Sequence, residues 1–227
     1  LQDAVLANLS PEFKAPLAAQ LASLELLLHR LATLGPEETR KLIVSLQRGA
    51  LRLTQLIDNL LESVRIEAGR VVLRRQAVHV DEVVEEAVEM IRPLADQRGQ
   101  AIDVQLPHPL PVVSGDGPRL VQVFVNLLAN AGKFAPDRTT IRVGGDVGAG
   151  FVTLFVEDEG PGWSEDVEPQ LFEPFVRSSG DEPESSGVGL GLYIAKSIVE
   201  RHGGTIDARS GSGRTRVAVK LPFASPA

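Results

Sequence analysis

The sequence predicts an α+β protein in which a helical hairpin domain precedes an α/β two-layer sandwich. Three observations lead to this fold class. Residues 1–69 are rich in leucine at helical spacing, residues 70–227 alternate between strand-like and helix-like apolar patterns, and a Gly-Pro pair divides the first part near its middle. We therefore expect two domains, residues 1–69 and residues 70–227.

The first domain is expected to form two helices joined by a short turn. In each helix, apolar residues step by four and three positions, which gives a narrow heptad seam. The seams consist of Leu17, Leu21, Leu24, Leu28 and Leu31, and of Leu46, Ala50, Leu53, Ile57, Leu60 and Val64. Between the seams, Gly35 is expected to end the first helix in a left-handed conformation and Pro36 to open the second.

Two helices of this size bury too little apolar surface to be stable alone. Further apolar residues lie outside the seams, at Leu26, Leu27, Leu42, Ile43, Leu56 and Leu61. They require a partner hairpin, so we expect the domain to dimerise as a four-helix bundle. The alternative is a hairpin that packs against the second domain of its own chain.

The second domain is expected to alternate strands and helices. Strands are expected at 71–80, 101–106, 111–114, 139–145, 151–157, 205–209 and 214–223, and helices at 81–99, 117–134 and 190–202. Because the later strands pair as hairpins and three helices accompany them, a two-layer sandwich is the expected arrangement.

Composition excludes several classes of function. The net charge of −7 provides no basic surface for nucleic acid, whose binding depends on Lys and Arg at phosphates. The absence of cysteine excludes thiolate chemistry and cysteine metal sites, and the four histidines lie too far apart for a local metal motif. No apolar run reaches the roughly 20 residues of a membrane-spanning helix, so this segment is expected to contact no membrane.

A glycine cluster, Gly187-Val-Gly-Leu-Gly191, opens the last expected helix. Glycines at alternate positions let the backbone approach a ligand, and the following helix presents free N–H groups to phosphate. The pattern predicts a phosphate cradle. A tight turn is the alternative, because no βαβ unit precedes the cluster as a dinucleotide-binding site requires.

An acidic turn, Glu157-Asp-Glu-Gly-Pro-Gly162, follows an expected strand. At this position, Asp158 can point into a pocket and accept a hydrogen bond from an exocyclic amine. An ordinary acidic turn is the alternative reading.

Three polar residues share one face of the helix expected at 117–134. Asn126 and Asn130 are four positions apart, and Lys133 follows three positions later. Amide oxygens suit Mg²⁺, which also keeps water and phosphate oxygens as ligands, so this face can hold a metal-bound triphosphate. A solvated polar stripe is the alternative, but the remainder of the helix is strongly apolar.

These motifs together resemble a known family. Asn126/Asn130/Lys133, Asp158-x-Gly160-x-Gly162, Leu171-Phe-Glu-Pro-Phe175 and Gly187-x-Gly189-x-Gly191 are similar, in this order, to the N, G1, F and G2 boxes of two-component sensor histidine kinases. The domain that carries these boxes has the GHKL or Bergerat ATP-binding fold. The helical hairpin resembles the dimerisation and histidine-phosphotransfer domain of the same family.

The resemblance implies ATP and Mg²⁺ as cofactors and a role for each matched residue. Asn130 would be a Mg²⁺ ligand with Asn126 beside it, Lys133 would reach phosphate, and Asp158 would bind the adenine amine next to Gly160 and Gly162. Gly187, Gly189 and Gly191 would line the triphosphate, and residues 176–186 would form the ATP lid. Hydrolytic GHKL enzymes carry a glutamate base four positions before the metal-binding Asn, where this chain has Asn126.

The acceptor position departs from the family pattern. Ser10-Pro-Glu-Phe-Lys-Ala-Pro-Leu17 aligns with the box that carries the phosphoacceptor histidine, and Pro11 stands in its place. Proline has no side-chain nucleophile, so no phosphoramidate can form there. Glu12, the candidate base by resemblance, remains. Ser10 is expected to cap a helix that breaks or restarts at this point.

The other histidines offer no substitute for the acceptor. His29 lies five helical turns beyond Pro11 and is expected on the surface of the bundle, and His202 reads as structural.

Three interpretations therefore follow. The chain is a degenerate kinase that binds Mg-ATP and acts by regulation, or it phosphorylates a partner in trans, or position 11 carries a substitution in an otherwise normal kinase. Expected partners are a second copy or a related kinase, and a response regulator receiver domain. Because the chain begins with Leu1, we expect a cytoplasmic segment of a longer sensor, which can itself be membrane-anchored.

Overall fold

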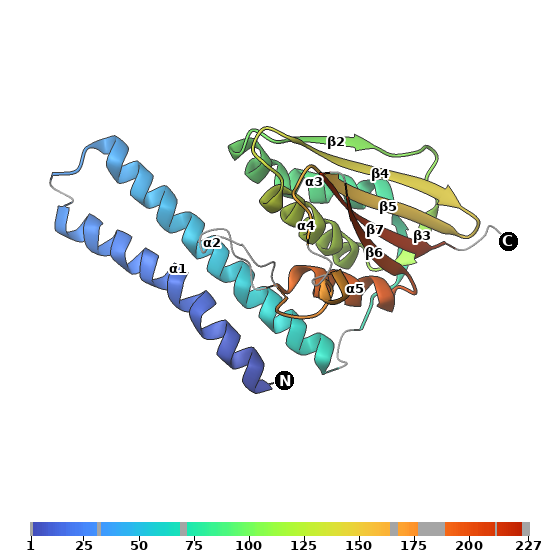
Figure 1. The fold of residues 1–227 in the computed structure, drawn as a ribbon, viewed down its shortest axis with the longest axis horizontal. Coiled ribbons are helices and arrows are strands. Elements are labelled where there is room, and N and C mark those ends of the chain that lie inside the picture. Colours follow the sequence, from blue (N-terminus) through green and yellow to red (C-terminus); the bar gives the residue numbers. More distant parts are fainter. Residues whose placement is uncertain are drawn as a thin grey trace.

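The computed structural model describes residues 2–30, 33–68, 72–163, 168–176, 189–211 and 213–223. Figure 1 shows two parts, a long helical hairpin and an α/β domain against which the end of the second hairpin helix lies. The predicted fold class, a helical hairpin followed by a two-layer α/β sandwich, is confirmed.

The hairpin consists of α1 (Gln2–Arg30) and α2 (Pro36–Glu67), which lie side by side in Figure 1. The helices approach closely at Gly49, where an added Cβ would lie 2.7 Å from Nε2 of Gln20. The same Gln20 amide donates a hydrogen bond of 3.3 Å to the carbonyl of Leu46. A small residue therefore allows a polar contact between the helices.

Two predictions about the hairpin are wrong. Gly35 has φ −66° and ψ 159°, so it is extended rather than left-handed, and it forms the N-cap of α2. The reason is local, since its N–H donates to Oε2 of Glu38 at 3.2 Å in a capping arrangement. Pro36 opens α2 as predicted. The expected break at Ser10 is absent because α1 continues through Pro11, which removes one N–H donor from a helix of 29 residues.

The main sheet has five strands in the order β2-β4-β5-β7-β6. They are β2 (Ala101–Gln105), β4 (Thr140–Gly148), β5 (Phe151–Asp158), β7 (Arg214–Pro222) and β6 (Thr205–Gly211). Only β2 and β4 are parallel, and the other neighbours pair antiparallel. The hairpins β4-β5 and β6-β7 were both predicted.

A separate two-stranded sheet joins β1 (Gln76–His79) to β3 (Val112–Gly115). The strand predicted at 71–80 is therefore too long. Arg74 donates its N–H to Oδ2 of Asp116 at 2.9 Å instead of to a strand, and Val80 already begins the next helix.

Three helices, α3 (Val80–Gln97), α4 (Gly117–Phe134) and α5 (Gly191–Arg201), cover one face of the main sheet, and a short helix η1 (Glu168–Gln170) precedes α5 (Figure 1). Alternate residues of β5 face these helices, and Val152, Leu154 and Val156 are buried against Phe124 and Leu128 of α4 in one apolar core. The opposite face of the sheet mixes aromatic and charged side chains, with Arg216 over the ring of Phe155 and Lys220 over that of Phe151.

His202 ties α5 to the start of α4. Its Nε2 accepts the N–H of Asp116 at 3.0 Å, and its Nδ1 lies 2.7 Å from the carbonyl of Ile198. Burial lowers the pKa of this imidazole, which agrees with a neutral ring that donates from Nδ1 and accepts at Nε2. These contacts agree with the structural role expected from the sequence.

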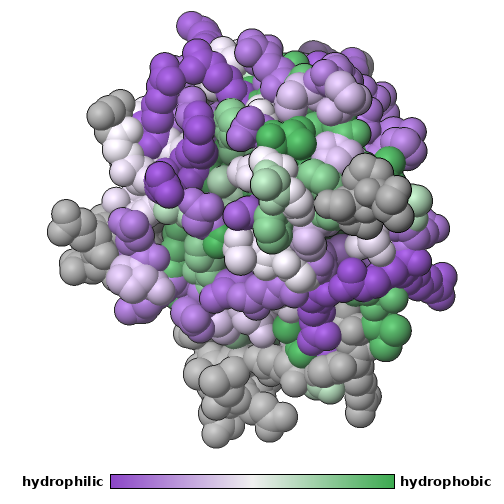
Figure 2. All heavy atoms as spheres, turned by 90° about the vertical axis from the view of Figure 1, so that its right-hand side faces the viewer, coloured by the Kyte–Doolittle hydropathy of each residue, from purple (hydrophilic) through white to green (hydrophobic). Residues whose placement is uncertain are grey.

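The surfaces of the two parts differ. Figure 2 shows small hydrophobic patches within a mostly hydrophilic surface on the face that it presents. On the hairpin, in contrast, many large apolar side chains are exposed. They include Leu17, Leu21, Leu24, Leu28, Ile43, Ile57, Leu61 and Val64. Within the described ranges, no helix combines the length and the hydrophobicity that crossing a membrane requires.

Candidate functional site

Helix α4 carries the first group of predicted site residues. The Asp116 carboxylate accepts the N–H of Arg119 at the N-cap, and a proline follows in the first turn, so the helix begins where the sequence predicts. Asn126, Asn130 and Lys133 lie half-buried along this helix. The Nδ2 atom of Asn126 is buried and has no hydrogen-bond partner in the part of the chain that the structure describes.

Asp158 ends β5 and is 5% exposed. The alternation of the strand turns its side chain toward the helix layer, as for Val156 two positions earlier. Its Oδ1 accepts the N–H of Gly160 at 2.7 Å. Burial raises the pKa of this carboxyl to about 6, a rise that the hydrogen bond from Gly160 opposes and the neighbouring charge of Glu157 supports.

The glycines after Asp158 are required by close contacts. A Cβ at Gly160 would lie 2.6 Å from Oδ1 of Asp158 and 3.2 Å from the carbonyl oxygen of Phe134, at the end of α4. Gly162 has φ +78°, and a Cβ there would collide with Oγ of Ser210. The turn therefore keeps the end of β5 close to the end of α4.

The segment before the lid contacts the glycine cluster. The N–H of Phe175 donates to the carbonyl of Gly189 at 3.0 Å, and Phe175 itself has φ +67°, an uncommon conformation for a bulky residue. Gly189 has φ +71°, and an added Cβ would lie 2.9 Å from the carbonyl carbon of Phe175 and closer still to the oxygen of Val176. Only glycine fits at this position.

The structure brings most of the predicted residues to one place. A Cβ at Gly191, where α5 begins, would lie 3.8 Å from the side chain of Asn126, so the glycine cluster faces α4. The C-terminal end of α4, about two turns beyond Asn126, meets Gly160 through Phe134. The turn after β5 and the start of α5 thus both contact α4, and Phe175 contacts the glycine cluster through Gly189.

Some predicted residues lie outside the described part. These are Gly187, the predicted lid from residue 177 onward, and the side chains of Pro11 and Glu12. The backbone of α1 is described at both hairpin positions.

The site suits a nucleotide chemically. Asp158 supplies a buried acceptor for an amine, and the N-terminus of α5 has no side-chain cap at Leu190. The Asn126 amide nitrogen beside it has no partner among the described residues. Among the described residues, no group of three or more His, Cys, Asp or Glu could hold a metal ion. A metal prediction therefore rests on the amide oxygen of Asn130, a hard oxygen ligand of the kind that Mg²⁺ takes together with phosphate.

Sequence reasoning missed the side chains that surround these motifs. On the outer face of the sheet, Glu157 pairs with Arg216 at 2.7 Å, Arg214 at 3.3 Å and Arg142 at 3.6 Å. At the end of α4, Arg98 and Gln100 bind the last carbonyls of the helix. No local pattern predicts either set, because the partners lie on different elements, 15 residues apart for Arg142 and Glu157 and more than 30 for the others.

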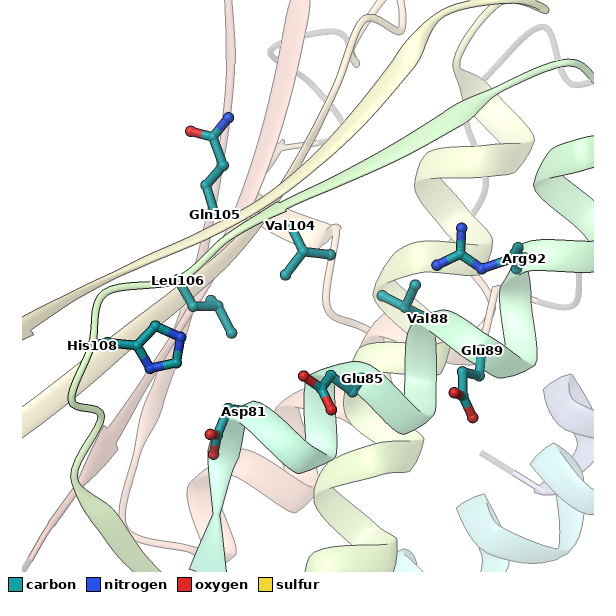
Figure 3. Close-up of a pocket in the computed structure, with 9 residues that line it drawn as sticks. All are labelled: Asp81, Glu85, Val88, Glu89, Arg92, Val104, Gln105, Leu106 and His108. Atoms are coloured by element: carbon teal, nitrogen blue, oxygen red, sulfur yellow. The ribbon is translucent and has the colours of Figure 1, made fainter.

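A groove of about 500 Å³ lies between α3 and β2, away from these motifs (Figure 3). Figure 3 shows Val104 and Leu106 of the sheet edge pointing toward the helix that carries Asp81 and Glu85. It contains none of the predicted site residues, so it is a separate surface feature.

Comparison with known proteins agrees with this arrangement. Residues 115–225 match the family described as histidine kinase-, DNA gyrase B-, and HSP90-like ATPase, and residues 1–69 match the His Kinase A (phospho-acceptor) domain. Fold and site together therefore define an ATPase-type domain joined to a phospho-acceptor-type hairpin. The chain belongs to the sensor histidine kinases of two-component signal transduction, of which it is a catalytic core.

Several relatives support this assignment. Sensor protein KdpD of Escherichia coli (strain K12) is 35% identical over 208 residues, which cover 92% of this chain and 23% of that protein. Signal transduction histidine-protein kinase BaeS of the same strain is 32% identical over 220 residues, which cover 96% of this chain and 46% of that protein. The chain thus spans less than half the length of these relatives.

Solved structures share the fold. Full-length ShkA in complex with AMPPNP has a TM-score of 0.70 at 28% identity, over 98% of this chain and 46% of that one. The histidine kinase AdeS of Acinetobacter baumannii has a TM-score of 0.73 at 22% identity, over 94% of this chain and 98% of that one.

Proposed function

We propose that this chain binds Mg-ATP through residues 70–227, that residues 1–69 form its dimerisation hairpin, and that it cannot phosphorylate itself at the usual acceptor position. The observation that carries the nucleotide part is that the turn after the buried Asp158 and the glycine cluster at the start of α5 both contact α4, the helix of Asn126, Asn130 and Lys133. The AMPPNP complex of ShkA supports it by similarity.

Each site residue has a defined task in this proposal. Asp158 accepts a hydrogen bond from the adenine amine, Gly160 and Gly162 shape the turn beside the base, and Lys133 binds phosphate. Gly187, Gly189 and Gly191 expose backbone N–H groups to the triphosphate, with Asn126 beside them. Asn130 holds the Mg²⁺, which supplies charge neutralisation to the phosphates when bound.

The hairpin is proposed to receive no phosphate at position 11. Pro11 offers no nucleophile, whereas the ATP-binding motifs are all present. A chain that keeps the nucleotide site without the acceptor suits regulation, in which nucleotide binding biases the conformation of the hairpin or of a related kinase bound to it. A response regulator receiver domain remains the proposed downstream partner.

Dimerisation is supported by the exposed apolar residues of the hairpin. Leu21 is 55% exposed and Leu28 is 78% exposed in the single chain, although both belong to the predicted seam of α1. Contiguous exposed leucines on a helical surface are typical of an interface. A second hairpin would cover them, and sedimentation equilibrium that shows only monomers would contradict this part of the proposal.

The test combines calorimetry of Mg-ATP binding with incorporation of labelled phosphate. We expect the wild-type chain to bind Mg-ATP without becoming labelled, and Pro11→His to bind with unchanged affinity and to become labelled. Asp158→Asn in the Pro11→His chain serves as the control that removes binding. Label on the wild-type hairpin would refute the loss of the acceptor, and absence of Mg-ATP binding would refute the nucleotide site.

A second candidate function is phosphorylation of a partner in trans, which the complete set of ATP motifs favours. A partner chain with Pro11→His and Asp158→Asn has an acceptor but no nucleotide site. Labelling of that chain by the wild type would support transfer in trans, and a lack of label would count against it.

A further inference from the structure

The last turn of α4 ends in a cluster of side-chain donors that the family comparison does not assign. A helix leaves its final carbonyls without partners inside the helix. In α4, the carbonyl of Ala131 accepts the N–H of Ala135 at 2.9 Å, whereas the carbonyls of Gly132 and Lys133 receive side chains from the segment between α3 and β2.

Arg98 supplies the first of these contacts. Its Nη1 donates to the carbonyls of Gly132 and Lys133, the latter at 2.8 Å, and its Nε donates to Oδ1 of Asp137 at 2.8 Å. A cation at a helix C-terminus also opposes the negative end of the helix dipole. The planar guanidinium therefore joins the last turn of α4 to the residues that follow it.

Gln100 supplies the second contact from a buried position. It is 4% exposed, and its Nε2 lies 3.1 Å from the carbonyl of Gly132, 3.2 Å from that of Ala135 and 3.1 Å from that of Pro136. A Cβ at Gly132 would lie 3.4 Å from Oε1 of Gln100, an ordinary van der Waals distance, so the contact depends on the Gln100 amide and not on the glycine.

The same turn of α4 lies between two parts of the proposed nucleotide site. Lys133 is the proposed phosphate ligand, and the carbonyl of the next residue, Phe134, faces Gly160 of the adenine turn. A shift of this turn would change the distance between the phosphate ligand and Asp158. We propose that Arg98 and Gln100 are positioning residues for nucleotide binding, which hold Lys133 and Asn130 at the distance from Asp158 that a nucleoside triphosphate requires.

This inference rests on the proposed function. It can be tested separately for the adenosine part and the triphosphate part of the ligand. Adenosine needs only the adenine turn, whereas Mg-ATP needs both that turn and the end of α4. A change at Arg98 should therefore weaken Mg-ATP binding selectively. A residue that merely stabilised the fold would affect both ligands alike.

The experiment compares Mg-ATP and adenosine on the full chain, by calorimetry and by the fluorescence of Trp163, the single tryptophan, which directly follows Gly162. For Arg98→Ala we expect Mg-ATP affinity to fall about tenfold, the scale of one charge-assisted hydrogen bond, with adenosine affinity unchanged. Arg98→Lys keeps the positive charge but cannot reach both the α4 carbonyls and Asp137, so its affinity for Mg-ATP should lie between those of the wild type and Arg98→Ala. Arg209→Ala, at an arginine whose side chain is 85% exposed, is the matched control.

The outcomes are distinguishable. Equal losses for both ligands, or an unchanged Mg-ATP affinity in Arg98→Ala, would overturn the positioning role while leaving the nucleotide site intact. A wild-type chain that binds neither ligand would refute the proposed function itself. Gln100→Leu is the second variant, and its thermal midpoint without nucleotide reports separately on folding because Gln100 is buried.

Discussion

The carboxyl group of Asp158 is buried, and burial disfavours its charged form. The pKa of this group rises from 3.8 to about 6, chiefly because of burial. Between these two values the folded state binds more protons than the unfolded chain, so the free energy of unfolding falls as pH rises through that window. Above pH 6 the buried charge costs the fold roughly 3 kcal/mol, at 1.36 kcal/mol for each pKa unit.

We expect Asp158→Asn to stabilise the nucleotide-free chain at pH 7 by up to about 3 kcal/mol, because an amide is neutral at every pH. The difference in the free energy of unfolding between Asp158→Asn and the wild type should shrink as pH falls from 6 to 4. Denaturant unfolding over this pH range measures it. The pKa of His202 is lowered by burial, so its protonation in the unfolded chain destabilises the fold as pH falls below 6.5. This effect is the same in the wild type and in Asp158→Asn, so it does not change the difference between them.

The variant should at the same time lose Mg-ATP binding. The N–H of Gly160 occupies one oxygen of Asp158, and an asparagine that keeps this bond presents an NH2 donor to the proposed adenine amine instead of the second acceptor oxygen. A difference in stability that stays constant with pH, or a wild type that is more stable at pH 7, would contradict the burial argument.

The elements show which parts of the fold local sequence determines. Helix α4 has the predicted bounds, since Asp116 caps its start and Ala135-Pro136 ends it. The hairpin β4-β5 follows from a glycine turn between alternating residues. The first strand was predicted too long because its limit is set by Arg74 bonding to Asp116, 42 residues away, and the contact of Arg98 with α4 is equally non-local.

In the candidate site too, some features follow from local sequence and others from contacts between distant residues. The sequence predicts Asp158, Asn126 and the glycines because each motif has a local chemical signature. It does not predict the positive φ of Phe175, which depends on the neighbouring Gly189 in the fold.

Two glycines provide a controlled test of the glycine cluster. Gly150 has φ +78° with nothing within 4 Å of an added Cβ, whereas Gly189 has φ +71° and faces Phe175 and Val176. An alanine should cost about 1–2 kcal/mol of stability at either position from its backbone conformation alone. Only Gly189→Ala should also displace the Phe175 segment, and we expect it to weaken Mg-ATP binding at least about tenfold.

Thermal unfolding and calorimetry of both variants separate the two effects. If Gly150→Ala weakens Mg-ATP binding as much as Gly189→Ala does, the loss reflects backbone strain and the contact argument is wrong.

At the scale of the whole molecule, the end of α2 is tied to the ATP-binding domain. Ile66 is buried in the core of that domain, and its carbonyl accepts Nη2 of Arg201 at 3.4 Å. Oε1 of Glu62 lies 2.7 Å from Nη1 of Arg119, and the Glu62 side chain is only 4% exposed. The end of the hairpin therefore packs on its own domain, as the alternative reading expects, and dimerisation through the exposed leucines stays a proposal.

This ion pair also connects the hairpin to the proposed nucleotide site, because Arg119 lies on α4, the helix that carries Asn126, Asn130 and Lys133. The exposure of its two partners is unequal, at 27% for Arg119 and 4% for Glu62. A buried charge that loses its partner is more costly than a half-exposed one, because water cannot replace the lost contact.

We therefore expect Arg119→Ala to destabilise the chain more than Glu62→Ala, by about 2 kcal/mol against about 1 kcal/mol. Among the described residues, Glu62 keeps only Arg65 as an ionic partner in Arg119→Ala, at 3.7 Å. In Glu62→Ala, the guanidinium still donates to Gln122 at 3.0 Å and reaches solvent. Denaturant unfolding of the wild type, the two single variants and the double variant gives a double-mutant cycle for this ion pair. The double variant should cost less than the sum of the single changes, because no unpaired carboxylate remains. Equal single effects that add in the double variant would show that the two side chains do not stabilise the contact between hairpin and domain.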